Sequence, residues 1–329
     1  MRRWMSCICF AVTVCSVAFA EKWWMDAKWR NWGCVENDDG SLMLIGVRPK
    51  MNGVVTLPRT LRGIPVTKIR EDAFRGNALL TEVTIPNNIV SIGDRAFCGC
   101  SNLRNLTFQE GIKSIDGSDA FRECRLLKTV TLPKGLEFIR QRAFKYSTNI
   151  ERVNVESVDD FLSIRFGTGS SSPLCDNKAC LYTNGVKITD LIIPKGITRI
   201  GSCTFNASRG MQSIYIPGSV VNIGSWSLNC GESTKIIFAN DLRVLHLDPY
   251  VAGDGRVKTA PISVQPRYGR PFVRWIDNEG HEVKDPFHSP EPITVRPCWD
   301  AKGRGRYSES ERIKVKVEVD MIKERMYKR

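Results

Sequence analysis

The sequence predicts a right-handed solenoid followed by a small β-rich module, and three observations carry that prediction. A motif of apolar residues returns about every 23 residues through most of the 329-residue chain. Within each copy, apolar and polar residues alternate over one short segment, as they do in a β-strand. A repeat of this size cannot enclose a core of its own, so successive copies must stack and bury their apolar side chains against one another.

The composition is that of a folded protein. Hydrophobic residues make up 42% of the chain and charged residues 25%, which excludes a disordered polymer. Lysine and arginine exceed aspartate and glutamate by 13, 48 against 35, which favours anionic partners in general but no specific nucleic acid. Histidine occurs only at His246, His281 and His288, and this weighs against histidine-based catalysis or metal binding in the first 240 residues.

Residues 1–20 have the pattern of a secretory signal peptide. Arg2 and Arg3 supply the positive start, an apolar stretch follows from Cys7 to Phe19, and Ala18-Phe19-Ala20 matches a cleavage site. The stretch is shorter than the roughly 20 residues that cross a bilayer, so we expect cleavage and no transmembrane segment in the mature chain. The sequence therefore predicts a secreted or cell-surface protein.

The clearest copy of the repeat lies between residues 80 and 100. Val83 and Ile85 alternate with polar residues, and Pro86 ends the expected strand because proline cannot donate the next ladder hydrogen bond. An Ile-Gly pair then turns the chain, and an Ala-Phe pair begins a short helical or irregular return. The equivalents of Ile85 are separated by 23, 24, 23, 38 and 23 residues: Ile85, Phe108, Leu132, Val155, Ile193 and Ile216.

One strand per turn, each beside its equivalent, makes a parallel sheet along the coil. The last strand residue, the isoleucine of Ile-Gly and the phenylalanine of Ala-Phe must then point inward. We expect this repeat core to consist of Ile85, Ile92, Phe97, Phe108, Ile115, Phe121, Leu132, Ile139, Phe144, Ile193, Ile200, Phe205, Ile216 and Ile223.

The frame Leu80 to Pro86, followed by Ile92-Gly93, Ala96-Phe97 and Cys100, resembles the BspA-like (Treponema pallidum type) class of leucine-rich repeats. Residues 63–69 also resemble the recognisable part of that family's amino-terminal cap. The resemblance spans roughly residues 33–240. It implies a leucine-rich-repeat solenoid with an N-terminal cap at 21–52 and repeats at 53–240, and a role in adhesion and extracellular interaction.

An insertion interrupts the repeats at about residues 156–190, where the chain runs 15 residues longer than one repeat. The amphipathic stretch Val158 to Phe166 suits a short helix, and Asn184-Gly185 suits the turn of a hairpin. The segment is either a packed bulge on the convex side or a binding loop. Cys175 and Cys180 lie close together within it and are the candidate disulfide, since an exported protein permits one.

From about Leu242 the repeat frame is lost, and residues 241–300 are expected to form the small β-rich module. Its order of residues resembles the Listeria–Bacteroides, or internalin B-type, repeat, with Phe272, Trp275, Val295 and Trp299 as its core. Residues 301–329 form a tail with ten basic and five acidic side chains. A solvated end is expected there, with contact to nucleic acid or anionic lipid as the alternative.

Strand alternation also identifies the side chains on the concave face. If Val83 and Ile85 face the interior, Thr84 faces out, and the equivalent positions down the sheet are Thr84, Thr107, Thr131, Asn154, Ile192, Tyr215 and Ile237. The threonines suit a ladder that stabilises the sheet. The later positions mix charge, amide and apolar groups, so we predict ligand contacts at Arg152, Asn154, Ile192, Tyr215 and Ile237.

No constellation for catalysis is recognisable. The histidines lie outside the main repeat region, Asp159-Asp160 has no partner carboxylate motif, and no phosphate loop or metal motif occurs. The sequence predicts no catalytic residue, metal or cofactor. We expect an exported non-catalytic binding protein that presents its solenoid to a protein or glycan. The alternative is a structural or envelope-assembly component that binds cell-wall polyanions or other copies of itself. The oligomeric state stays open.

Overall fold

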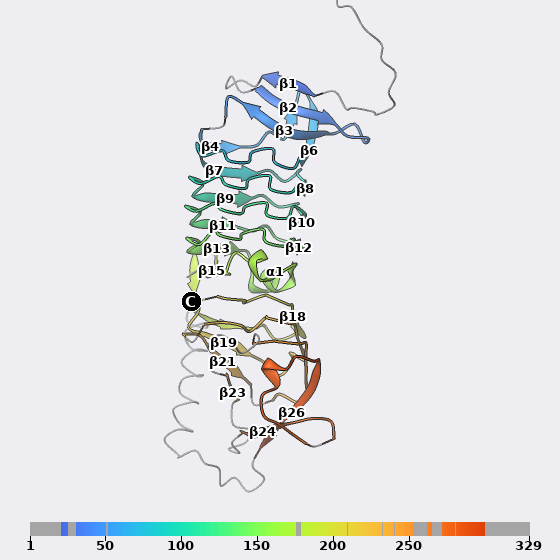
Figure 1. Cartoon of the computed structure of the whole chain (residues 1–329), viewed down its shortest axis with the longest axis vertical. Coiled ribbons are helices and arrows are strands. Elements are labelled where there is room, and N and C mark those ends of the chain that lie inside the picture. Colours follow the sequence, from blue (N-terminus) through green and yellow to red (C-terminus); the bar gives the residue numbers. More distant parts are fainter. Residues whose placement is uncertain are drawn as a thin grey trace, which may run out of the picture.

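The computed structural model describes residues 21–25, 31–50, 52–175, 179–208, 210–231, 233–239, 241–252, 262–264, 272–279 and 281–299. They form an elongated solenoid whose coils stack along the long axis, with short strands on two sides (Figure 1). The predicted solenoid is confirmed. The predicted signal peptide, residues 1–20, and the basic tail, residues 301–329, lie outside the described residues.

A small sheet closes the amino-terminal end. Strands β1 (Lys22–Met25), β2 (Asn31–Glu36) and β3 (Leu42–Arg48) pair antiparallel. Strand β6 (Ile64–Ile69) then pairs in parallel with β3 and antiparallel with β5 (Thr60–Leu61). Trp32 is fully buried under this sheet and meets Phe74 of the first coil edge to face, so the cap covers the open end of the core.

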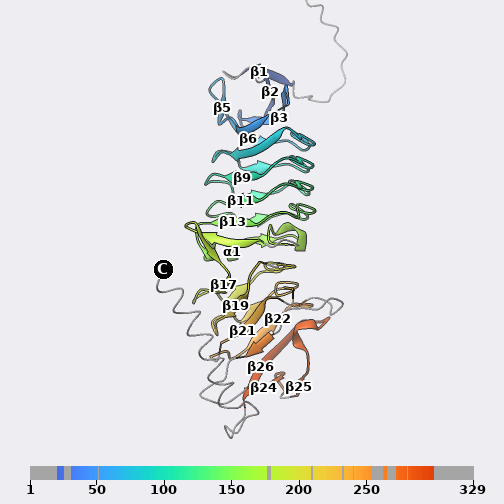
Figure 2. The same cartoon turned by 90° about the vertical axis from the view of Figure 1, so that its left-hand side faces the viewer.

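The first strand column carries the predicted parallel strands. It consists of β4 (Gly53–Thr56), β7 (Leu80–Ile85), β9 (Asn105–Phe108), β11 (Thr129–Thr131), β13 (Arg152–Val155) and β15 (Cys180–Thr183). Each pairs in parallel with the next, and β16 (Val186–Ile188) ends this sheet as an antiparallel strand. Figure 2 shows these strands stacked one above the other.

The isoleucine of the expected Ile-Gly turn, or its equivalent, ends a short strand, and these strands form a second column. Its members are two residues long: β8 (Ser91–Ile92), β10 (Ser114–Ile115), β12 (Phe138–Ile139) and β14 (Arg165–Phe166). Strand β8 continues the cap sheet through β6, and the other three form one parallel sheet. The Ala-Phe return that follows is a series of turns, without an α-helix.

After the second column, two glycines lie where neighbouring coils leave no room for a side chain. A Cβ atom at Gly117 would overlap the carbonyl oxygen of Gly93, and one at Gly93 would lie 2.5 Å from the backbone nitrogen of Glu71. Both clashes are with backbone, which cannot give way. Glycine is therefore required at these two positions, whereas Arg70 and Arg140 occupy the position equivalent to Gly93 in other coils.

The segment at 156–190 contains a further coil, so the expected bulge on the convex side is not what it forms. Strand β14 pairs with β12 and β15 pairs with β13, which extends both columns. The register places Thr183 beside Val155, a coil of 28 residues, and ten more residues lead to Ile193. The longer coil accommodates helix α1 (Val158–Ser163), and the ten residues form the predicted hairpin.

Strand pairing stops in both columns after this coil. It begins again within the next coils, so that the strands on the two sides of this level belong to different sheets. Strands β17 (Asp190–Ile192), β19 (Ser213–Ile216), β21 (Lys235–Phe238) and β23 (Ile262–Val264) form a second parallel sheet. Strands β18 (Arg199–Ile200), β20 (Asn222–Ile223) and β22 (Leu245–Leu247) resume the second column. Among the described strands, none pairs across this level.

A stack of phenylalanine rings fills the interior. Phe74, Phe97, Phe121 and Phe144 stack in order, with ring centroids 5.0, 5.3 and 5.5 Å apart. The coil at 156–183 has no phenylalanine at this position, and Phe161 of α1 instead packs 6.3 Å from Phe205 of the next coil. All fourteen residues expected in the repeat core are buried, none more than 4% exposed.

Buried thiols connect neighbouring coils beside this stack. The Sγ atoms of Cys100, Cys124 and Cys230 donate to phenylalanine carbonyl oxygens of the preceding coil, at 3.3 to 3.5 Å. Ser147 makes the same contact through Oγ at 2.8 Å. Burial raises the pKa of Cys100 and of Cys230 to about 12. These thiols stay neutral at physiological pH and act as small hydrogen-bond donors.

Two parallel strands of the solenoid, β22 and β23, lie beyond the boundary predicted at residue 240, and antiparallel strands follow them. Strand β26 (Ile293–Trp299) pairs antiparallel with β22 and with β24 (Phe272–Ile276), which also pairs with β25 (Glu282–Val283). Trp275 and Val295 are buried as expected, but the aromatic cluster around Trp275 includes Phe287 and Phe238 of β21. The side chains of Phe272 and Trp299 lie outside the described residues. The resemblance to a Listeria–Bacteroides repeat stays a prediction.

Candidate functional site

The predicted contact residues belong to a row of side chains on the outer side of the first strand column. Thr84, Thr107, Thr131 and Asn154 occupy one register position on successive strands. Asn154 Nδ2 donates to Thr131 Oγ1 at 2.9 Å, which ties β13 to β11 through side chains as well as backbone. This part of the row supports the sheet and fixes the orientation of Asn154.

Tyr182 continues the row where the sequence predicted Ile192. The register places it beside Asn154, because β15 supplies the next strand. The guanidinium carbon of Arg152 lies 4.0 Å from the centroid of the Tyr182 ring, a close cation–π contact. The alternation of Leu181, Tyr182 and Thr183 was the signal that could have identified this strand.

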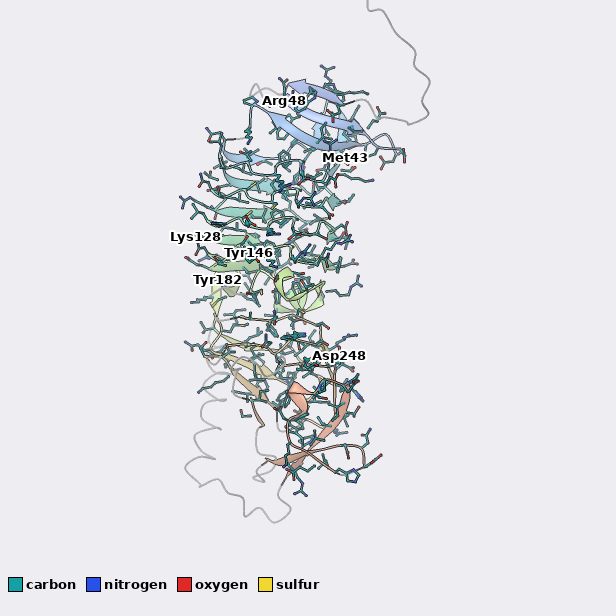
Figure 3. All side chains as sticks on the ribbon, viewed as in Figure 1. Met43, Arg48, Lys128, Tyr146, Tyr182 and Asp248 are labelled. Carbon is teal, nitrogen blue, oxygen red and sulfur yellow. The ribbon has the colours of Figure 1, made fainter. Side chains whose placement is uncertain are left out.

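The hairpin after β15 adds a second cation beside this ring. Asn184 and Gly185 have φ values of 49° and 79°, as a type I′ turn requires. The turn brings Lys187 of β16 opposite Tyr182 in the antiparallel register. Figure 3 shows Tyr182 and Lys128 on the same side of the molecule, that of the first strand column. We call Arg152, Asn154, Tyr182 and Lys187 the strand-face cluster.

The strand-face cluster carries excess positive charge. Lys128 is compensated by Glu151, with Nζ and Oε1 3.7 Å apart. Arg152 is exposed and makes no ion pair with a carboxylate among the described residues, and Lys187 is exposed as well. An arginine held flat on an aromatic ring keeps its N–H groups available at the edge of the guanidinium plane, where carboxylate, sulfate or phosphate groups bind.

The remaining predicted contacts lie on the second sheet. Ile192, Tyr215 and Ile237 share one register position on β17, β19 and β21. Ile192 and Tyr215 are partly exposed, and burial, together with the charge of Asp241, raises the pKa of the Tyr215 hydroxyl. Ile237 is only 6% exposed, so its prediction as a contact residue is wrong. Strand β23 lies beside β21, and Ile237 is therefore not at the edge of the sheet.

The candidate disulfide between Cys175 and Cys180 is also absent. Both cysteines are buried, and their sulfur atoms are not bonded to one another. Cys180 Sγ donates to the carbonyl oxygen of Gly210 at 2.7 Å, and Asn206 Nδ2 approaches Cys175 Sγ at 3.9 Å. Closeness in sequence was misleading here, because the two thiols make contacts with the following coil instead of with one another.

The acidic and histidine side chains considered for catalysis have other partners. Asp160 is bound by the N-cap residue of helix α1, Ser157: Ser157 Oγ accepts the Asp160 backbone N–H at 3.1 Å and donates to the Asp160 carboxylate at 2.6 Å. His246 Nδ1 lies 2.9 Å from Thr294 Oγ1 across the β22–β26 pair. At the turn near His281, a cation could be shared by the side chains of three residues: Asp277, Glu279 and His281. Asp277 Oδ1 accepts the backbone N–H groups of Glu279 and His281, which organises that turn.

A family model for the BspA type leucine-rich repeat region matches the chain in six copies, over residues 62–167 and 177–249. The chain belongs to the BspA-type leucine-rich repeat family. Members of this family are in general non-catalytic binding proteins of the cell surface. The second matched range ends nine residues beyond the predicted boundary at 240, and it contains strand β22. Among the described residues, no helix is long and apolar enough to cross a membrane.

Solved bacterial leucine-rich repeat proteins are similar to this chain. A Treponema pallidum leucine-rich repeat protein is 21% identical over 66% of this chain and 86% of its own, with a TM-score of 0.41. A leucine-rich cell surface protein of Faecalibacterium prausnitzii is 20% identical, over 67% and 76%, with a TM-score of 0.32. A Bacteroides capillosus leucine-rich repeat protein is 25% identical, over 37% and 91%, with a TM-score of 0.32. No curated protein matches the chain significantly.

Proposed function

We propose that this chain is an exported adhesion protein that binds an acidic protein or glycan through the strand-face cluster. The observation that carries the proposal is the exposed guanidinium of Arg152, held 4.0 Å from the centroid of the Tyr182 ring. Asn154 lies beside Tyr182 in register and is fixed by its bond to Thr131, so all three side chains are ordered before a ligand arrives. Pre-ordered contacts reduce the entropy lost on binding.

Ile192 and Tyr215 extend the proposed surface on the second sheet. They are partly exposed and lie side by side on β17 and β19. Tyrosine and isoleucine at a surface suit contact with the apolar part of a protein or sugar. A ligand that reaches from Arg152 to Tyr215 must cross the level at which strand pairing stops, so it must be larger than a single side chain or sugar ring.

Export to the cell surface is the second part of the proposal. It rests on the positive start, apolar stretch and cleavage pattern in residues 1–20 and on the family to which the chain belongs. Six of the described cysteines are buried, and they are compatible with either redox environment because burial protects a thiol from oxidants.

A pull-down of the chain without residues 1–20 tests the binding role. Extracellular-matrix proteins and cell-envelope fractions serve as bait, at low and at high salt. The double variant Arg152→Ala, Tyr182→Ala should lower capture about tenfold or more, as loss of a central arginine–aromatic pair does at other interfaces. Adding Tyr215→Ala should abolish capture of a ligand that spans both sheets.

Arg165→Ala is the matched control. Arg165 also lies over an aromatic ring, with its guanidinium carbon 5.5 Å from the centroid of Phe138, but it belongs to the second strand column. Its loss should leave capture unchanged. Equal loss in the control and in the Arg152 variant, or unchanged capture in both, would move the binding site away from the strand-face cluster.

The alternative role is a component of the cell envelope that binds polyanions or other copies of the chain. The excess of 13 positive charges favours it, since a basic protein is attracted to cell-wall polyanions. Charge-driven contacts between exposed groups weaken as salt shortens the screening length, about 10 Å at 0.1 M. Capture of envelope fractions alone, lost at high salt, would favour this role over adhesion.

A further inference from the structure

One position in the turn of most coils has a left-handed backbone, and its occupants change along the solenoid. Its φ lies between 53° and 62° at Asp72, Arg95, Asp119, Arg142, Cys203, Trp226 and Tyr250. In most of these coils the backbone N–H at this position donates to a carbonyl of the next coil, as Trp226 does to Tyr250 at 2.9 Å. The stacking of the coils therefore imposes the backbone conformation, and the side chain is free to vary.

Side chains at this position contact their equivalents one coil away. In the first half of the solenoid they form ion pairs: Arg95 with Asp72 and Arg142 with Asp119, each with an N–O distance of 2.9 Å. In the last coils Trp226 and Tyr250 replace these charges. Their ring centroids lie 6.0 Å apart, the rings are inclined by 37°, and both side chains are partly exposed. The aromatic pair therefore faces solvent at a place where earlier coils present charge.

Bulky aromatic residues rarely occupy this conformation. A left-handed φ costs an ordinary residue roughly 1–2 kcal/mol, and asparagine, aspartate and glycine adopt it most readily. Two successive coils nevertheless carry the largest aromatic side chains there. The ion pairs of the earlier coils show that the stacking itself needs no aromatic ring at this position.

The pair also differs from five other aromatic side chains of the described residues. A cation lies over the rings of Trp23, Trp24, Phe138, Tyr146 and Tyr182, with 4.0 to 5.5 Å between the charged group and the centroid. Among the described residues, no arginine or lysine lies over Trp226 or Tyr250. The nearest charged residue along the chain is Asp248, two positions before Tyr250, and its carboxylate disfavours an anionic ligand.

We propose that Trp226 and Tyr250 form a stacking site for an uncharged sugar chain of β-linked hexopyranose units. Because the hydroxyl groups of such a ring are equatorial, its two faces carry C–H groups and can stack on aromatic side chains. The hydroxyl groups at the edge of the ring need hydrogen-bond acceptors at the rim of the stacking site. Asp248, two residues before Tyr250 in the chain, is the acceptor that we assign to this role. Figure 3 places Asp248 on the side of the molecule opposite Tyr182, so this site is separate from the strand-face cluster.

Calorimetric titration of the full chain with cellohexaose, chitohexaose and laminarihexaose tests the proposal. At least one of these uncharged hexaoses should bind, and the affinity should be unchanged by salt because no charge is neutralised. Trp226→Asn and Tyr250→Asn should each weaken binding about tenfold or more, since each removes one ring of the pair. Asparagine tolerates the left-handed backbone, so both variants should fold, which circular dichroism and the melting temperature will check.

Tyr146→Asn is the matched control. Tyr146 also has a left-handed backbone, with φ 65°, and an exposed ring, but Arg122 and Lys145 lie over that ring. Its loss should not change hexaose binding, and neither should Arg152→Ala, which separates this site from the proposed function. Failure of the wild-type chain to bind any of the three sugars would overturn the proposal. Full affinity in the folded Trp226→Asn and Tyr250→Asn variants would do the same.

Discussion

Phe97 occupies the middle of the phenylalanine stack, with Phe74 on one side at 5.0 Å and Phe121 on the other at 5.3 Å. Its side chain is fully buried. Replacing it with leucine keeps an apolar side chain in the core but removes both stacked contacts. Aromatic pairs contribute about 0.5–1.5 kcal/mol beyond their buried area, so Phe97→Leu should lower the free energy of unfolding by about 1–3 kcal/mol. Phe97→Ala should cost about 3–5 kcal/mol, because it also leaves a cavity.

A double-mutant cycle isolates the stacking between neighbouring coils. Phe97→Leu and Phe121→Leu share one contact, so their combined effect should differ from the sum of the single effects by about 0.5–1.5 kcal/mol. Phe205 lies beyond the level at which strand pairing stops, and it packs against Phe161 instead. A cycle of Phe97→Leu with Phe205→Leu should therefore be additive to within about 0.5 kcal/mol.

Urea unfolding provides the measurement, followed by circular dichroism and by tryptophan fluorescence so that coincident transitions justify a two-state fit. Equal coupling energies in the two cycles would refute the reasoning, whether both are zero or both are large. The first result would mean that the rings contribute only their buried area. The second would mean that the coils respond as one body, and not through nearest neighbours.

Two further predictions concern the spacing of the coils and the buried thiols. Gly117→Ala should destabilise the chain by about 3 kcal/mol or more, because its methyl group meets the backbone of the preceding coil. Gly185→Ala has open space around the new methyl group and should cost only the roughly 1–2 kcal/mol of left-handed strain. Similar urea midpoints for the two variants would contradict this prediction. Cys100 and Cys230 have pKa values of about 12 in the folded state, above the ordinary value near 9, so the stability that their burial contributes is complete below about pH 9 and is lost as the pH rises toward 12. Both thiols should resist a disulfide reagent at pH 8 until urea unfolds the chain, and rapid labelling of the native protein would show that they are accessible.

The repeat core could be predicted from the sequence because its physical cause is local and periodic. Ile92, Phe97 and their equivalents recur at the coil length, and each has only one apolar environment to enter. The same argument identifies the strands of the first column. It did not identify the second column, since a strand of two residues such as Ser91–Ile92 is too short for alternation to be visible.

The candidate site was predicted less well, because it depends on register across the insertion. Counting from Val155 to Ile193 as one long repeat placed Ile192 beside Asn154, whereas a 28-residue coil puts Tyr182 there. Ile237 was expected to face outward as a ligand contact, but it is buried, and β23, which follows beyond the recognisable repeats, lies beside its strand. Both errors concern which strands are neighbours, and spacing within a repeat carries no information about that.

The interruption of strand pairing between β16 and β17 has a mechanical consequence. On either side of it, coils are tied by ladders of backbone hydrogen bonds, while contacts such as Phe161 with Phe205 and Cys180 with Gly210 join the two blocks. Bending of the rod should concentrate at this joint, since side-chain packing shears more easily than a bonded ladder. Arg152 and Tyr215 lie on opposite blocks. A pulling force on the protein should therefore change the distance between these two residues before it changes the strand pairing within either block.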